Sequence, residues 1–188
     1  MSTAYQEFGN QDELPRLVAA LSARTIVVDV EPLVAPWNSS QEALDGGIMR
    51  VLDQAGGIQG LRAVCFATNS ARRPSALPRV EGIDVSYLVS AGKPVRTARY
   101  ARLPRPGVVV GDQVLTDGLL ARRLDFSFLH YRPALRAPIG PRLLDSIGRL
   151  MRRHDLARHG KDRSTPGRWE CGRVQRRGRR ARCQSCCQ

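Results

Sequence analysis

Short apolar runs that alternate with amphipathic segments limit most strongly what this chain can fold into. Apolar runs occupy residues 25–30, 61–67 and 107–110, and each has the length of a buried strand. After the first run, residues 41–54 carry apolar side chains at helical spacing. Strands that alternate with helices are typical of βα units, in which helices cover a parallel sheet. The sequence therefore predicts an α/β fold: a single Rossmann-like domain with three layers and a mostly parallel sheet.

The rest of the chain continues this alternation. Residues 71–80 make a poor helix, because Pro74 and Pro78 interrupt them. Pro141 stands at the start of the last helical pattern, where proline is tolerated. Further helices are predicted at residues 14–23, 94–103, 116–123 and 141–158, and further strands at residues 85–89 and 126–131.

The positive charge of the chain is concentrated in its last fifth. Residues 151–188 contain 12 Lys/Arg and 3 Asp/Glu, whereas residues 1–150 contain 18 and 14. Towards the C-terminus the apolar periodicity ends and Arg, Gly and Cys dominate, which predicts a disordered tail at residues 161–188. We therefore expect an N-terminal extension at residues 1–11, one domain at residues 12–160, and the tail.

Two further hypotheses concern this tail. Its arginines could attract nucleic-acid phosphates non-specifically, so nucleic acid is expected as a partner only through the tail. Four thiolates, from Cys171, Cys183, Cys186 and Cys187, could bind Zn²⁺, but the surrounding sequence lacks apolar residues to build a knuckle. The fifth cysteine, Cys65, lies in an apolar run and is expected to be buried.

The sequence predicts a cytoplasmic protein. The N-terminal residues are polar and acidic and lack the apolar centre of a signal peptide. The longest uninterrupted apolar runs, such as residues 26–28 and 108–110, are far shorter than the roughly 20 residues that span a bilayer.

Polar residues that follow the apolar runs define a candidate site. In an open parallel sheet, ligands collect beyond the carboxyl ends of the strands. Carboxylates at that edge suit a hard cation such as Mg²⁺, while hydroxyl, amide and ammonium groups can hold a phosphoryl group. The residues in these positions are Asp29, Glu31, Thr68, Asn69, Lys93, Asp112 and Asp117.

The order and spacing of these residues resemble the four motifs of the haloacid dehalogenase (HAD) superfamily. A closer similarity is to its YqeG-type branch in phosphatase subclass IIIA, carried by the segments VVDVEPLVAPW, FATNS, AGKP and VVVGDQVLTDGLLARRL. The resemblance covers about residues 12–160 and implies a HAD-like fold. From Asp29 to Thr68 is 39 residues and from Thr68 to Lys93 is 25, so no sizeable cap domain fits between the motifs.

The resemblance implies how the phosphoryl group would be handled. Asp29 would be the nucleophile and would form an aspartyl-phosphate, which divides hydrolysis into two easier steps. Thr68 and Asn69 would bind the transferring phosphoryl group. Lys93 would contact the same group and stabilise its charge.

The resemblance also implies a metal ligand set and a proton donor. Mg²⁺ would be bound by Asp29, Asp112 and the backbone carbonyl of Glu31, with Asp117 in a supporting position. Without the resemblance, Asp117 could simply cap the helix that follows it. The Glu31 side chain would protonate the leaving group and then activate water.

The loop after Asp29 departs from the family pattern. Glu31 stands where the family has Asp, and a displacement of one methylene can cost about 10²-fold in rate. Pro32 and Leu33 stand where the family has Asn and Thr. The nearby Trp37 is expected to pack against the domain or to line the rim of the site.

Two functional hypotheses follow. The first is a Mg²⁺-dependent phosphatase acting on a phosphomonoester, either a small molecule or a lipid phosphate such as phosphatidylglycerophosphate, on which some relatives of this branch act. Residues 141–158 would then contact an anionic membrane peripherally, at its inner face. The alternative is a catalytically degenerate HAD-like domain that binds a phosphorylated ligand or a protein partner. No role is predicted for His130, His154 or His159, which lack metal-ligand spacing.

Overall fold

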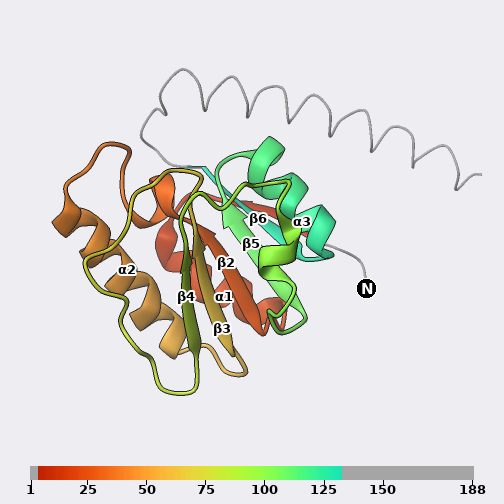
Figure 1. The fold of residues 1–188 in the computed structure, drawn as a ribbon. Helices are drawn as coiled ribbons and strands as arrows, with labels where there is room; N and C mark the ends of the chain where they lie inside the picture. Colours follow the sequence, from red (N-terminus) through yellow and green to blue (C-terminus); the bar gives the residue numbers. More distant parts are fainter. Residues whose placement is uncertain (1–3, 133–188) are drawn as a thin grey trace, which may run out of the picture.

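Six short strands form one sheet in which every neighbouring pair is parallel (Figure 1). The computed structural model describes residues 4–132. Along the sheet the strand order is β1-β6-β5-β2-β3-β4. The strands are β1 (Tyr5–Phe8), β2 (Thr25–Asp29), β3 (Ala63–Ala67), β4 (Asp84–Leu88), β5 (Gly107–Gly111) and β6 (Ser127–Tyr131).

Helical segments cover both faces of this sheet (Figure 1). On one face, α1 (Leu14–Ala20) and α2 (Gln41–Gly56) pack on alternate side chains of the central strands, such as Val28. On the other face, α3 (Leu119–Leu124) packs on the intervening side chains, such as Val27. Cys65 is buried on this second side, as predicted. The structure therefore confirms the three-layer, Rossmann-like α/β fold.

Helix α2 shows why a glycine pair is tolerated inside a helix. Its N-terminus is capped by Ser40, whose hydroxyl accepts a hydrogen bond from the Ala43 N–H. At Gly47 the helix passes so close to Val34 that an added Cβ would lie 1.8 Å from the Val34 carbonyl oxygen. Val34 ends the helical turn η2 (Val30–Val34), so this close contact supports the loop that follows β2.

The helix predicted over residues 94–103 is wrong, because the structure has a single 3-10 turn there, η3 (Thr97–Tyr100). Pro94 has no N–H to donate, and the N–H groups of Val95 and Arg96 both bond to the Gly92 carbonyl, which makes a tight turn instead. The helix expected at residues 116–123 is present: the π-helical segment η4 (Val114–Gly118) leads directly into α3.

The N-terminal segment contributes a strand that the sequence did not predict. Residues 5–8, expected in an extension, form β1 and pair in parallel with β6, followed by the turn η1 (Gln11–Glu13). The helix expected at residues 141–158 and the Cys-rich tail lie outside the described residues. Among residues 4–132, no helix combines the length and hydropathy that crossing a membrane requires.

The strand order places the candidate site at the centre of the sheet. Strand β2 lies between β3 and β5, and the chain runs outward in opposite directions from the β2–β5 pair. Parallel sheets bind ligands beyond the carboxyl ends of their strands at such a reversal. Asp29 ends β2, and Asp112 directly follows β5.

Candidate functional site

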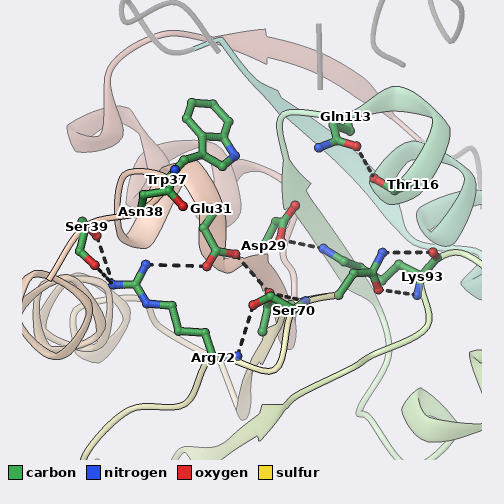
Figure 2. A pocket seen from close by; sticks show the side chains of 12 residues that line it. Asp29, Glu31, Trp37, Asn38, Ser39, Ser70, Arg72, Lys93, Gln113 and Thr116 are labelled. Carbon is green, nitrogen blue, oxygen red and sulfur yellow. Dashed lines mark hydrogen bonds and ion pairs between the residues drawn. The ribbon is translucent and has the colours of Figure 1, made fainter. Parts of the chain in front are cut away.

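A pocket of about 700 Å³ opens at the carboxyl ends of β2, β3 and β5 (Figure 2). Side chains reach it from the loops that follow these strands and from the segment before η3. They include five of the seven predicted site residues, with Asp112 and Asp117 directly beneath the loop that carries Gln113. The 12 side chains that line the pocket come from Asp29, Glu31, Trp37, Asn38, Ser39, Thr68, Asn69, Ser70, Arg72, Lys93, Gln113 and Thr116.

Three buried carboxylates and one buried ammonium form the inner part of the site. Lys93 Nζ lies 2.7 Å from Asp29 Oδ1 and 2.8 Å from Asp117 Oδ1. Asp29, Asp112 and Asp117 each offer a carboxylate oxygen, and these three atoms lie within 4.8 Å of one another. We call these four residues the carboxylate–lysine cluster.

The charges in this cluster act strongly on one another because water is excluded from it. Burial raises the pKa of Asp29 well above its ordinary value, and the negative charge of Asp117 adds to this, while Lys93 opposes it. Burial disfavours the charged form of Lys93, but Asp117 and Asp29 outweigh it and hold the Lys93 pKa above its ordinary value. Lys93 is therefore a fixed positive charge beside Asp29, and any further positive charge near Asp29 would lower the raised pKa of that carboxyl.

Both carboxylate oxygens of Asp117 accept hydrogen bonds, and its position explains why residue 111 is a glycine. Its Oδ1 accepts a hydrogen bond from Lys93, and its Oδ2 accepts one from the Gln113 N–H at 3.3 Å. A Cβ added at Gly111 would lie 2.3 Å from that same Oδ2. The structure thus places Asp117 as a buried partner of Lys93 and not as an exposed helix cap.

The donor set of the cluster fits a hard divalent cation. The four side chains, if all ionised, carry three negative charges and one positive charge in a buried position. Carboxylate oxygens are the ligands that Mg²⁺ prefers. Asp29, Asp112 and Asp117 are the residues placed to hold such an ion, although Asp29 Oδ1 and Asp117 Oδ1 are also paired with Lys93.

Asn69 lines the pocket and also fixes the backbone of Lys93. Its Nδ2 donates to the Lys93 carbonyl at 3.2 Å, and its Oδ1 accepts from the Lys93 N–H at 2.9 Å. The role of Asn69 as a phosphate ligand stays a prediction, and the second hydrogen of its Nδ2 is the group that could make such a contact.

The outer part of the site is centred on Glu31, which leaves the end of β2 on turn η2. Glu31 Oε2 accepts a hydrogen bond from the Thr68 hydroxyl at 3.0 Å, and Glu31 Oε1 lies 3.7 Å from a guanidinium nitrogen of Arg72 (Figure 2). The longer side chain of Glu thus bridges from its own loop to the loop after β3. Thr68, whose hydroxyl is predicted to bind phosphate, thus forms a hydrogen bond with Glu31, the residue predicted to transfer protons.

Arg72 is a site residue that sequence reasoning missed. Its Nη2 donates to the carbonyl oxygens of Ser39 and Ser40, at 2.8 and 2.7 Å, and to the Ser39 hydroxyl at 3.1 Å. It therefore ties the loop after β3 to the loop that leads into α2. With Glu31, Ser39 and the predicted rim residue Trp37, which does line the pocket, Arg72 forms what we call the outer wall.

His130 is a second residue whose position the sequence did not indicate. It is buried in β6, and its Nε2 lies 3.0 Å from the Asp112 carbonyl oxygen. Its Nδ1 lies 2.7 Å from the Tyr5 hydroxyl of β1. The N-terminal strand is thus linked through one imidazole to the backbone of a cluster residue.

Comparison of the chain with protein-family models, with curated proteins and with solved structures gives no match. The function is therefore inferred from the geometry of the site. A buried carboxylate at a strand end, an ammonium in contact with it and further carboxylates close by are suited to phosphoryl transfer, which depends on positioning and charge stabilisation.

Proposed function

We propose that this chain is a Mg²⁺-dependent phosphomonoesterase of the HAD type that acts through an aspartyl-phosphate on Asp29. One observation carries the proposal: Asp29 ends the central strand 2.7 Å from Lys93, with carboxylate oxygens of Asp112 and Asp117 within 4.8 Å of its own. This arrangement supports the proposal because it would supply a nucleophile, a positive charge and ligands for a hard cation, as the motif order predicts. It comes from three separate strands, so local sequence does not explain it.

In the first step an Asp29 oxygen attacks phosphorus, and the bond from phosphorus to the leaving oxygen breaks as the new bond forms. The Glu31 carboxyl gives its proton to the leaving oxygen, which departs as an alcohol. Lys93 neutralises charge on the phosphoryl oxygens. Bound Mg²⁺ would add positive charge beside Asp29 and would polarise the phosphoryl group.

In the second step water attacks the phosphorus of the aspartyl-phosphate, and Glu31, now a carboxylate, accepts the proton of that water. The bond from phosphorus to Asp29 breaks, which releases inorganic phosphate and restores the nucleophile. The contacts of Glu31 with Thr68 and Arg72 support this role, because they hold its carboxylate at the pocket and on the substrate side of β2.

The alternative is a domain that binds a phosphorylated ligand without turnover. The loop after Asp29 favours it: Pro32 and Leu33 stand where the motif pattern has Asn and Thr, and Glu31, the proposed proton donor, already accepts the Thr68 hydroxyl at 3.0 Å. Phosphate would have to displace this contact before transfer.

Phosphate release from p-nitrophenyl phosphate by the full chain separates the two functions. We expect release that requires Mg²⁺ and disappears in Asp29→Asn, a nearly isosteric change that removes the nucleophile. Glu31→Gln should lose most activity, whereas Glu31→Asp should retain part of it. If folded wild type releases no phosphate but Mg²⁺-dependent phosphate binding is measurable by calorimetry, the binding domain is supported and the enzyme is rejected.

A further inference from the structure

The pocket beyond the carboxylate–lysine cluster has an unusual lining. Most ligand pockets are lined mainly by hydrophobic side chains. Of the described residues that line this one, none has an aliphatic side chain. Around the outer wall the pocket is lined by the amides of Asn38 and Gln113, the hydroxyl of Thr116 and the indole of Trp37.

Trp37 is held at the corner of a tight turn that faces the pocket (Figure 2). The Ser39 N–H donates to the Pro36 carbonyl at 3.2 Å, and Asn38, the third residue of the turn, has a φ of 59°. A positive φ at the third residue of the turn, without a positive φ at the second, is the geometry of a type II turn, and Asn is tolerated at that third position. The turn therefore presents the indole outward from the backbone, at the rim of the site.

Arg72 makes this turn part of a preformed surface. Its guanidinium bonds to Ser39 and Ser40 on the C-terminal side of the turn, while its backbone carbonyl accepts a hydrogen bond from the Tyr87 hydroxyl of β4 at 3.1 Å. The turn is thus anchored to the sheet through one residue. A binding surface that is already ordered loses less conformational entropy when a ligand binds.

An indole beside amides and hydroxyls matches a particular ligand chemistry. The indole offers a flat face to a ring, and the Asn38 amide offers a donor and an acceptor to ring hydroxyls. The Gln113 amide offers its Nε2 as a donor, while its Oε1 accepts from the Thr116 hydroxyl at 3.4 Å. No Val, Leu, Ile, Met or Phe side chain lines the described part of this pocket, so an acyl chain would meet only the indole and the stems of polar side chains.

We propose that Trp37, Asn38 and Gln113 form a leaving-group subsite that takes a hydroxylated ring, so that the substrate is a sugar phosphate or a nucleoside monophosphate. This inference rests on the proposed phosphatase function, because the subsite binds the alcohol that the reaction releases. It makes the lipid phosphate of the sequence-based hypothesis the weaker substrate.

Kinetics of the full chain tests the subsite with four substrates: ribose 5-phosphate, adenosine 5′-monophosphate, glycerol 3-phosphate and dihexanoyl phosphatidic acid. We expect the two ring phosphates to have the higher kcat/KM, and the better of them identifies sugar or nucleoside. Trp37→Ala should raise the KM of that substrate roughly tenfold, within the range for loss of one aromatic stacking contact. KM for glycerol 3-phosphate should stay unchanged, and Trp37→Phe should largely restore ring binding.

Met49→Ala, on the exposed side of α2, is the matched control and should change none of these values. Equal kcat/KM for glycerol 3-phosphate and the ring phosphates, or the same loss in Trp37→Ala for all four substrates, would overturn the subsite and leave the phosphatase intact. A preference for dihexanoyl phosphatidic acid would also overturn it. Absence of hydrolysis of every substrate rejects the phosphatase and the subsite together.

Binding gives a readout that does not depend on turnover. The chain has 2 tryptophans, so Trp169→Phe leaves Trp37 as the one indole reporter. In Asp29→Asn with Trp169→Phe, the preferred ring phosphate should change the indole emission, whereas glycerol 3-phosphate should bind with little change. Competition between inorganic phosphate and the ring phosphate separates failure of the subsite from failure of the phosphatase. If phosphate binds but no ring phosphate changes the indole emission, the subsite alone is rejected.

Discussion

The carboxylate–lysine cluster and the outer wall lie side by side but are built differently. In the cluster, Lys93 and Asp117 side chains are 3% and 0% exposed and lie 2.8 Å apart. In the outer wall, Arg72 and Glu31 are 18% and 15% exposed and lie 3.7 Å apart. Buried charges must be closely paired, whereas partly exposed ones interact more weakly and tolerate change. Glu31, which belongs to the outer wall, and Pro32 and Leu33, which follow it, are the residues that differ from the motifs that the sequence resembles.

The largest effect should come from breaking the cluster. Lys93→Met removes the ammonium and leaves buried carboxylates uncompensated, so we expect a loss of about 3–5 kcal/mol in unfolding free energy. Urea unfolding with EDTA present measures it. Arg50→Met, at an exposed position of α2, should stay within about 0.5 kcal/mol of wild type. A Lys93→Met protein as stable as wild type would show that the cluster is not the strongly coupled unit described above.

Two neighbouring glycines test the support of the outer wall. Gly47→Ala would place a Cβ 1.8 Å from the Val34 carbonyl oxygen, so it should lower stability by about 1–3 kcal/mol and displace the η2 turn that carries Glu31. At Gly46 nothing lies within 4 Å of an added Cβ, and Gly46→Ala should gain about 0.5–1 kcal/mol. The unfolding temperature should therefore fall in Gly47→Ala and rise slightly in Gly46→Ala. Phosphate release should fall in Gly47→Ala and stay unchanged in Gly46→Ala. Equal effects of the two changes would contradict the close contact.

Removing Arg72 should weaken the outer wall and leave the cluster intact. We expect Arg72→Ala to lower kcat about tenfold, because Glu31 loses a contact and the loop at Ser39 is no longer fixed. A leaving oxygen of high basicity needs its proton more, so the loss should be greater with an alkyl phosphate than with p-nitrophenyl phosphate. Mg²⁺ affinity should stay as in wild type. An equal loss of kcat for both substrates would show that Arg72 does not act through protonation of the leaving group by Glu31.

The smallest effect concerns the edge strand β1. The Tyr5 hydroxyl, which donates to Glu7 at 2.7 Å, and the charge of Arg132 hold the Glu7 pKa below its ordinary value of 4.5, against the effect of burial. Because the folded pKa is lowered, this contact adds stability above pH 4.5 and loses it as pH falls through the folded pKa. Tyr5→Phe should reduce the difference in unfolding free energy between pH 7 and pH 3 by less than about 1 kcal/mol, because Glu7 is largely exposed. Urea unfolding at pH 7 and pH 3 measures the difference.

The sequence predicted those parts of the molecule in which local pattern and tertiary role coincide. The central strands β2, β3 and β5 are buried on both faces, so continuous apolar runs identify them. Asp29 and Asp112 follow such runs directly, and their position at the site follows from the topology of a parallel sheet.

Other parts could not be predicted because their cause is tertiary. Strand β1 has the sequence YQEF, which lacks an apolar run and becomes a strand because β6 offers it an edge. Arg72 resembles the other arginines of the chain until the fold brings it beside Ser39. His130 has no motif around it, and its role depends on the distant carbonyl of Asp112.

Chemical trapping tests the central claim most directly. The full chain is mixed with Mg²⁺ and p-nitrophenyl phosphate, quenched in acid, reduced with borohydride and digested for peptide mass spectrometry. An aspartyl-phosphate on Asp29 predicts homoserine at position 29, present with both Mg²⁺ and substrate and absent when either is omitted. Phosphate release without any homoserine at position 29, or with homoserine at position 112 or 117 instead, would contradict the assignment of the nucleophile.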